Sequence, residues 1–282
     1  LGSLYGLQVK GGEPEQQHLQ QQQQQQQQKY RQPPLRQQPH DRRKQTQSRA
    51  VMPDCRGPNP GAHSTAPHAS TAMSADDLIL YTNPMSRGRI ARWMLEEVGQ
   101  PYRVEIVEFD GGTEAPAFRA INPMGKVPTL VHGGVVVTEA AAICAYLAET
   151  FPQAGLLPAP TPAARAAYHR WMFFAAGPLE AAVTAKALGL LAPAERARMA
   201  GYGSFERTVD TLEQAAAAAS PWLTGERFTA ADVYAGSQIA WGQMFKSLPP
   251  RPAFTAYVER LQARPAWQRA SALDDAAMPS TG

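Results

Sequence analysis

The sequence is poor in cysteine and in spacings that bind metal ions. Cys55 and Cys144 are its two cysteines, so it has neither a disulfide framework nor a Cys-x-x-Cys redox pair. Its six histidines show no metal-ligand spacing, and we expect no metal site. These features are typical of a protein that works in a reducing compartment, and we predict a cytoplasmic location.

Long hydrophobic runs are also missing, and large apolar residues are scarce in the first quarter of the chain. Glutamine occupies every position from 20 to 28, amid prolines and scattered basic residues. Such a segment cannot bury enough apolar surface to offset the entropy lost on ordering. We therefore expect residues 1–74 to form a disordered low-complexity tail, with Met73 as a plausible natural start. No run is long enough to suggest a membrane partner.

An excess of charge of one sign is missing from the rest of the chain. Nine of the 27 Lys and Arg residues precede Met73, but only four of the 24 Asp and Glu residues do. The net charge of +3 is therefore a property of the tail. The remainder is slightly acidic and gives no electrostatic reason to expect a nucleic-acid partner.

The chain after the tail begins with an alternation of strand and helix patterns. The expected elements are, in order, strand 78–81, helix 87–98, strand 102–107, a short helix 115–120, strands 127–131 and 135–137, and helix 139–151. Gly133-Gly134 predicts a hairpin turn between the last two strands. The first two strands should be parallel because a helix connects them. We predict a thioredoxin-like α/β domain over residues 75–153.

A proline-rich linker at residues 152–162 separates this region from one with almost only helical patterns. A long helix over residues 163–191 should kink at Gly177-Pro178. A second should begin at Pro193 and run to the alanines at 215–219. The capping box Thr229–Asp232 begins another helix, and helices 253–264 and 266–272 complete an all-helical domain over residues 160–275.

The most informative motif is Asn-Pro-Met-Gly-Lys-Val-Pro-Thr-Leu at residues 122–130, followed by Glu139 at the start of a helix. With the capping box and the order of domains, these residues resemble the glutathione transferase family, most closely bacterial members whose first loop reads Ser-Arg-Gly-Arg. The resemblance covers about residues 77–273. It implies conjugation of glutathione to a small electrophile, usually by a homodimer, with no metal or other cofactor.

The resemblance assigns the glutathione site to five residues. Val127, before a cis Pro128, would pair with the extended backbone of the tripeptide. Glu139 would hold its α-amine, and the N–H groups near Ala140 its α-carboxylate. The family usually has serine where Ala140 stands, so the loss of one hydrogen bond, about 0.5–1.5 kcal/mol, is expected. Lys126 is a candidate for the glycine carboxylate.

The glutathione thiol needs a hydrogen-bond donor, because its ordinary pKa of about 8.5 leaves little thiolate at neutral pH. Three residues in or beside the loop after the first strand compete for this role. Ser86 matches the position of the catalytic cysteine in beta-class bacterial enzymes. Tyr81 resembles the strand-end tyrosine of other classes, and Asn83 resembles the donor of a third group. Ser86 can also be a plain helix cap.

An electrophile needs an apolar wall beside the sulfur. The resemblance places that wall on the first helix of the second domain, where Tyr168, Trp171, Met172 and Phe174 are the candidates; an aromatic stripe can equally be core. Arg87 and Arg89 would either attract the anionic peptide or form ion pairs with a nearby acidic residue, namely Glu96, Glu97 or Asp110.

Two other functions remain open from the sequence. One is glutathione-dependent reduction of disulfides or peroxides, although the first loop has no cysteine. The other is a non-catalytic binding module with the same fold. Glutathione conjugation is the leading interpretation, consistent with a role in detoxification.

Overall fold

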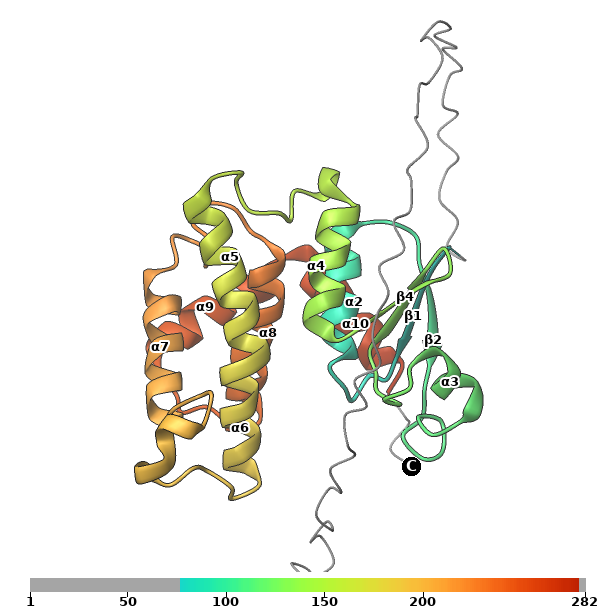
Figure 1. Cartoon of the computed structure of the whole chain (residues 1–282). Coiled ribbons are helices and arrows are strands. Elements are labelled where there is room, and N and C mark those ends of the chain that lie inside the picture. The colour runs from blue at the N-terminus through green and yellow to red at the C-terminus, as the bar shows by residue number, and fades with distance from the viewer. Residues whose placement is uncertain (1–76, 279–282) are drawn as a thin grey trace, which may run out of the picture. The chain divides into compact units, whose positions relative to one another are not determined.

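The computed structural model describes residues 77–278, and the prediction of a disordered tail over residues 1–74 lies outside them. The first part of the described chain is a small sheet with helices on both faces (Figure 1). Its elements are β1 (Leu78–Thr82), α2 (Gly88–Val98), β2 (Arg103–Ile106), α3 (Pro116–Ile121), β3 (Thr129–His132), β4 (Val135–Thr138) and α4 (Ala140–Thr150). This order confirms the predicted alternation of strands and helices.

The four strands lie in the order β2-β1-β3-β4. β1 and β2 are parallel, as the connecting helix predicted, and β3 runs antiparallel to both β1 and β4. Gly133 and Gly134 form the hairpin turn with φ values of 54° and 84°, which is left-handed backbone that glycine adopts without steric cost. The predicted thioredoxin-like topology is confirmed.

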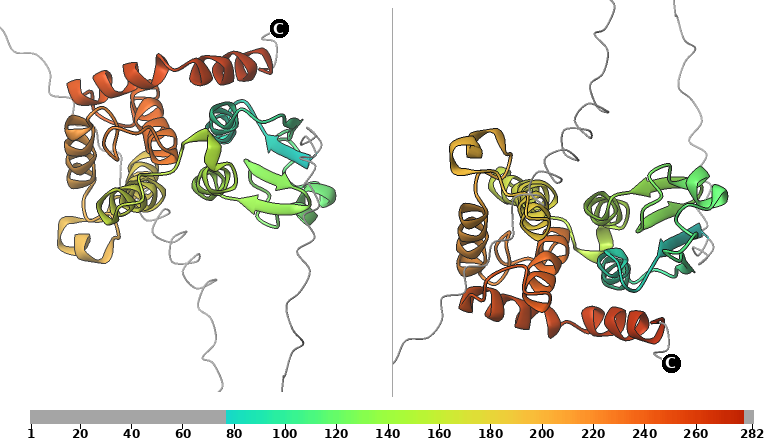
Figure 2. Two further views of the ribbon diagram at one scale, coloured as in Figure 1. Left: turned by 90° about the horizontal axis from the view of Figure 1, so that it is seen from above. Right: turned by 90° about the horizontal axis from the view of Figure 1, so that it is seen from below.

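Helices α2 and α4 cover one face of this sheet, and α3 lies on the other (Figure 2). Ile90 and Met94 on α2, Ile143 and Leu147 on α4, and Leu80 on β1 are all at most 1% exposed. Their i, i+4 spacing puts one apolar stripe of each helix against the sheet. Burial of each such side chain contributes about 1.5–3 kcal/mol, which fixes the first turns of α2 and α4 relative to the strand ends.

The second part of the described chain is helical. Its elements are η2 (Pro152–Ala154), α5 (Pro162–Phe174), the π-helical η3 (Ala175–Leu179), α6 (Glu180–Ala187), η4 (Ala194–Met199), α7 (Phe205–Ala218), α8 (Ala230–Met244), α9 (Pro252–Gln262) and α10 (Pro265–Ala276). The predicted fold class, a thioredoxin-like domain followed by an all-helical domain, is therefore confirmed.

The predicted irregularity at Gly177-Pro178 is present as the π-helical segment η3 between α5 and α6. Proline has no N–H to donate and its ring crowds the carbonyl four residues earlier, so a regular α-helix cannot pass through it. The wider i→i+5 turn accommodates Pro178 without ending the helix.

The prediction of one continuous helix from Pro193 to the alanines at 215–219 is wrong. The structure has the short 3₁₀ segment η4, then a turn that contains Gly203 at φ 68°, and only then α7. Ser204 begins α7 as its N-cap, with its Oγ accepting a hydrogen bond from the Arg207 N–H at 3.2 Å. The two glycines and the capping serine outweigh the helix propensity of the flanking alanines.

The predicted capping box at the start of α8 is confirmed. The buried Asp232 carboxylate accepts hydrogen bonds from the Thr229 N–H at 2.8 Å, the Leu223 N–H at 2.8 Å and the Tyr257 hydroxyl at 2.6 Å. One side chain thereby joins the start of α8 to the preceding loop and to α9. These hydrogen bonds fix the first turns of α8, a helix that packs against α2, α4, α5 and α9.

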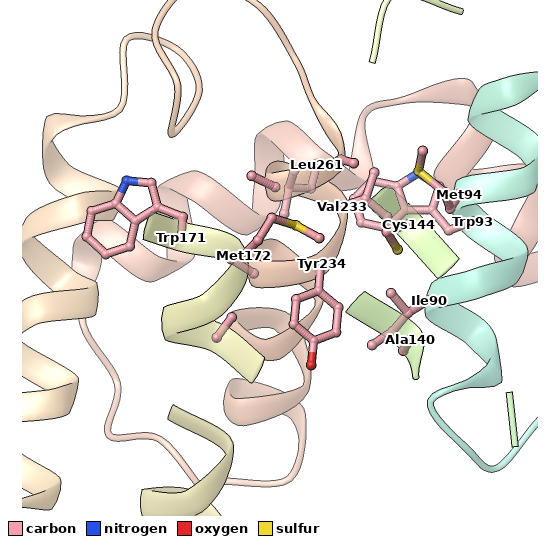
Figure 3. Packing of buried hydrophobic residues seen from close by; sticks show 14 of the residues in the cluster. Ile90, Trp93, Met94, Ala140, Cys144, Trp171, Met172, Val233, Tyr234 and Leu261 are labelled. Carbon is pink, nitrogen blue, oxygen red and sulfur yellow. The ribbon is translucent and has the colours of Figure 1, made fainter. Parts of the chain in front are cut away.

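A common core joins the two parts. Figure 3 shows Ile90 and Trp93 from α2, Cys144 from α4, Met172 from α5 and Val233 from α8 in one cluster of buried side chains. Helix α10 returns from the second part and packs along α2 (Figure 2). Within residues 77–278, no helix has the length and apolar character needed to cross a membrane.

Candidate functional site

A cavity of about 970 Å³ opens where the starts of α2 and α4 face helix α5. Its walls come from the loop before β3, the end of β4, one face of α4 along its whole length, and the cavity-facing side of α5 and η3. The residue before α2, the first residue of α6 and one residue of α8 complete the lining. All five predicted glutathione-binding residues line it: Lys126, Val127, Pro128, Glu139 and Ala140. Segments more than 100 residues apart in the sequence thus share one concave surface.

Asn122 explains the shape of the loop that carries Val127. Its buried amide donates to the Lys126 carbonyl at 2.8 Å and to the Thr129 hydroxyl at 3.0 Å, and its Oδ1 accepts from the Met124 N–H at 3.1 Å. Three bonds from one side chain hold the whole turn. Asn122 also lines the cavity, and the sequence motif contained it without revealing this bracing role.

The Val127–Pro128 peptide bond is cis, as the family resemblance predicted. Within residues 77–278, no hydrogen bond engages the backbone N–H or C=O of Val127. An unpaired donor and acceptor on one residue at a cavity wall are what an extended peptide needs for two-sided pairing.

Glu139 is held in an uncommon backbone conformation at the start of α4. Its φ of 66° and ψ of 120° lie outside the regions that non-glycine residues normally occupy. Its carbonyl accepts the Ile143 N–H at 2.9 Å, which begins the helix. Glu139 and the next three residues all line the cavity. The side-chain carboxylate and the N–H groups of the first helical turn therefore meet at one place, as an amino-acid zwitterion requires.

The three candidate thiol activators do not line this cavity. Tyr81 packs its ring against Phe118, with centroids 5.8 Å apart. Asn83 is buried, and its amide donates to the Val107 carbonyl at 3.1 Å while its Oδ1 accepts from the Met85 N–H. Asn83 therefore has a structural role that the sequence did not suggest.

Ser86, like Tyr81, is half-buried. Its hydroxyl donates to the Asn83 carbonyl at 2.7 Å and accepts from the Gly88 N–H at 2.9 Å. Arg87, the next residue, does line the cavity. A ligand sulfur near this loop would find the Ser86 proton committed to Asn83 unless the hydroxyl rotates.

The expected partners of the two loop arginines were wrong. Arg87 forms an ion pair with Glu180 at the start of α6, and both residues line the cavity. Arg89 reaches Asp275 on α10 at 2.7 Å. Both partners lie in the second part of the chain, more than 90 residues away, so the local sequence could not indicate them.

Two of the four residues predicted to form the electrophile wall on α5 face the cavity. Tyr168 and Met172 line the cavity, whereas Trp171 and Phe174 do not. Trp171 instead stacks edge-on with Phe174, with ring centroids 5.6 Å apart, and Figure 3 shows it well to the side of Tyr234 and Met172. At 100° per residue, positions 171 and 174 lie on the opposite side of α5 from the face that carries the four lining positions 168, 169, 172 and 173.

Two neighbours on the cavity-facing side of α5, His169 and Phe173, line the cavity in their place. They share a helical face with Tyr168 and Met172 because each pair is four residues apart. Met172 alone could not have identified Phe173, because Trp171 and Phe173 lie about 100° to either side of it on a helical wheel. Cys144 is completely buried and burial raises the pKa of its thiol, in agreement with the predicted inert core residue.

Tyr234 on α8 was not predicted as a site residue. It is 5% exposed and lines the cavity, and Figure 3 shows its hydroxyl pointing away from the apolar cluster. Burial raises the pKa of Tyr234 to about 12, with a further contribution from Glu180. The group is therefore a neutral donor at physiological pH. Within residues 77–278 no three His, Cys, Asp or Glu side chains are grouped to hold a metal ion.

Comparison with known proteins agrees with this geometry. The family model for the glutathione S-transferase N-terminal domain matches residues 85–150, and the model for the C-terminal domain matches residues 192–265. Maleylacetoacetate isomerase of Rattus norvegicus is 30% identical over 167 residues, which cover 56% of this chain and 74% of that protein. Glutathione S-transferase 3 of Zea mays is 29% identical over 209 residues, covering 68% of this chain and 92% of that protein.

A solved relative shares the fold. The theta class glutathione S-transferase of Xanthomonas axonopodis pv. citri, crystallised with glutathione bound, is 33% identical with a TM-score of 0.56, and the match covers 69% of this chain and 97% of that one. The chain belongs to the glutathione S-transferase family.

Proposed function

We propose that this chain is a glutathione transferase that joins the sulfur of glutathione to an electrophilic carbon of a small hydrophobic compound. The observation that carries the proposal is that one cavity contains the unpaired backbone of Val127 together with Glu139 and the first turn of α4. These groups complement the middle and the γ-glutamyl end of the tripeptide.

Glutathione is placed as follows. Its cysteine backbone pairs with the N–H and C=O of Val127, beside Pro128. Its α-amine meets the Glu139 carboxylate, and its α-carboxylate meets the N–H groups at Ala140 and the next residues. Lys126 lies on the same wall and takes the glycine carboxylate.

The bound thiol loses its proton to solvent, and the thiolate lone pair forms the carbon–sulfur bond while the leaving group departs with its electrons. Ser86 remains the first choice of donor to the thiolate, with Tyr81 and Asn83 behind it. The start of α2 adds favourable potential for an anion. The reaction as proposed needs glutathione as co-substrate and no metal or other cofactor.

The electrophile occupies the part of the cavity lined by Tyr168, Met172 and Phe173. Three mostly apolar side chains give a non-directional wall, which favours hydrophobic acceptors. Trp171 and Phe174 do not belong to this surface. The physiological role we propose for such a reaction is detoxification in the cytoplasm.

A homodimer is part of the proposal. Val135 and Val136 on β4 and Phe173 on α5 are apolar side chains that are 55%, 44% and 73% exposed. Contact with a second copy would cover them.

We also propose that the two domains extend over residues 75–153 and 160–275, as the sequence suggested.

The deciding experiment is a titration of the thiol of bound glutathione, followed by the ultraviolet absorbance of the thiolate, in the parent and in Ser86→Ala. We expect a pKa one to two units below the free value of about 8.5 in the parent. Ser86→Ala should return it toward that value, whereas Ser204→Ala, a helix cap on α7, should leave it unchanged. An ordinary pKa in the parent rules out the proposal.

The two alternative functions predict different assay results. A disulfide reductase would turn over hydroxyethyl disulfide faster than a chlorodinitrobenzene acceptor, although the loop at residues 82–89 contains no cysteine. A non-catalytic module would fail to be retained on immobilised glutathione. We expect retention, elution by free glutathione, and faster conjugation than reduction.

A further inference from the structure

Helix α10 at the end of the described chain is connected to the loop that carries Ser86. The connection runs through Arg89 in the first turn of α2. Its Nε donates to the Pro84 carbonyl at 2.6 Å, and its Nη2 donates to Asp275 Oδ1 on α10 at 2.7 Å. One planar guanidinium therefore bonds a loop carbonyl through Nε and a carboxylate on α10 through Nη2.

The loop itself is short, and Asn83 and Ser86 make most of its hydrogen bonds. Between β1 and α2 the Ser86 N–H and hydroxyl both donate to the Asn83 carbonyl, and the Gly88 N–H donates to the Ser86 hydroxyl. Pro84 lies inside this turn, and its carbonyl faces Arg89 rather than another backbone group. That peptide unit is held from both sides, because its carbonyl accepts from Arg89 and its N–H, on Met85, donates to Asn83 Oδ1 at 2.9 Å. Loss of the Arg89 bond would leave one hydrogen bond to set its orientation and the direction of the next two side chains.

Arg89 is in turn held by a group outside its own domain. Asp275 follows Asp274, which pairs with Arg92 one turn further along α2 at 2.7 Å, with both side chains almost completely buried. Asp274 and Asp275 thus contact two arginines spaced i, i+3 on the same face of α2. The buried pair fixes the register of α10 on α2 and brings Asp275 to Arg89.

We propose that Arg89 and Asp275 are positioning residues, through which the C-terminal helix sets the geometry of the thiol-activating loop. The inference rests on the proposed function, since it concerns the same loop. It predicts that a residue in the last helix, 189 positions from Ser86 in the sequence, controls activation of the sulfur without contacting glutathione.

The test compares Asp275→Ala with Arg269→Ala. Arg269 pairs with Glu96 at 3.0 Å, so it belongs to the same α2–α10 contact. Glu96 lies seven residues from Arg89, about 10 Å along the helix. Both variants remove one partner of a partly exposed ion pair, and both should shift the unfolding midpoint by a similar small amount. Their effects on the loop should differ.

In Asp275→Ala we expect kcat/KM for conjugation at pH 6.5 to fall about three- to tenfold, with the pKa of the bound thiol raised, because small displacements of catalytic groups are costly. Arg269→Ala should change neither. Arg89→Lys, which keeps the charge but lacks the planar fork, should resemble Asp275→Ala. Equal activity losses in Asp275→Ala and Arg269→Ala, or no loss in Asp275→Ala, overturn the inference.

Hydrogen exchange gives a reading that is independent of catalysis. Amides in a peptide covering residues 83–88 should exchange several-fold faster in Asp275→Ala than in the parent or in Arg269→Ala, without glutathione present. If exchange is unchanged in Asp275→Ala while the pKa of the thiol bound to the parent is lowered, the Arg89–Asp275 brace is wrong and the enzyme assignment is right. Faster exchange with no glutathione binding in the parent means that the enzyme assignment, and with it the proposed role of the brace, fails.

Discussion

Arg92 Nε lies 2.7 Å from Asp274 Oδ1, and the two side chains are only 6% and 1% exposed. This ion pair joins the first helix of the thioredoxin-like part to the last helix of the described chain. Burial raises the pKa of Asp274, although Arg92 and Arg89 both oppose the shift. The carboxylate therefore depends on its cationic neighbours to stay ionised.

Replacing Arg92 with methionine should destabilise the fold by about 3–5 kcal/mol, because it leaves a buried carboxylate without its partner. Arg269→Ala, which removes an exposed partner from the same helix pair, should cost about 0–1 kcal/mol. Urea unfolding measures both. Similar losses of unfolding free energy in the two variants would show that burial of the Arg92–Asp274 pair does not increase the cost of removing one partner.

The Arg92→Met deficit should also depend on pH. A carboxyl whose pKa is raised in the folded state binds its proton more tightly there than in the unfolded chain, so acid favours the folded state. As pH falls from 8 to 5, Asp274 in the variant takes up a proton and the deficit relative to the parent should shrink. A deficit that grows over this range contradicts the assignment.

Gly88→Ala should disturb the thiol-activating loop. A Cβ at this position would lie 1.8 Å from Thr82 Oγ1 and 2.9 Å from Ser86 Oγ, so one of these side chains must move. We expect a loss of about 1–3 kcal/mol in stability and a larger loss of conjugating activity. Gly201→Ala is the matched control, since a Cβ there meets nothing within 4 Å. Full activity in Gly88→Ala would mean that the loop geometry is not critical.

Ala140→Ser should strengthen glutathione binding. Ala140 is 7% exposed in the cavity wall at the first position of α4, where a hydroxyl can reach the ligand α-carboxylate. One added hydrogen bond is worth about 0.5–1.5 kcal/mol, or up to about tenfold in Kd. Calorimetric titration with glutathione measures the change, and Ala217→Ser, on the exposed side of α7 and outside the cavity lining, should show little. Weaker binding in Ala140→Ser would place the carboxylate elsewhere.

Tyr234→Phe should act on the electrophile rather than on glutathione. Its hydroxyl reaches the cavity, so the variant should conjugate chlorodinitrobenzene about three- to tenfold more slowly while iodomethane, which has no oxygen acceptor, reacts at the parental rate. With the pKa of Tyr234 raised to about 12, the ratio of parent to variant rates should be constant from pH 6 to 10. A decline in that ratio above pH 9 would indicate an ordinary tyrosine.

The sequence was a good guide wherever the determinant is local. Gly133-Gly134, Pro178 and the Thr229–Asp232 box each act within a few residues. The structure has the turn and the cap where they were expected, and a π-helical segment where a kink was expected. The motif around Val127 and the helix start at Glu139 were also placed correctly, because a strand end and a helix start can be read from neighbouring residues.

What the sequence could not give depends on contacts between distant segments. The partners of Arg87 and Arg89 lie on α6 and α10, and no local pattern relates them. The rotation of α5 decided whether Trp171 or Phe173 faces the cavity, and an aromatic stripe on several sides of a helix leaves that rotation undetermined. Tyr234 reaches the cavity because α8 packs against both α2 and α4.

Because of the unusual backbone of Glu139, thermal stability and ligand affinity favour different residues at this position. A left-handed φ there is costly for any residue with a side chain and free for glycine, so Glu139→Gly should relieve strain. The same change deletes the carboxylate that we propose as the partner of the ligand amine. A laboratory selection for heat resistance alone would therefore drift toward variants that melt later and no longer hold the tripeptide.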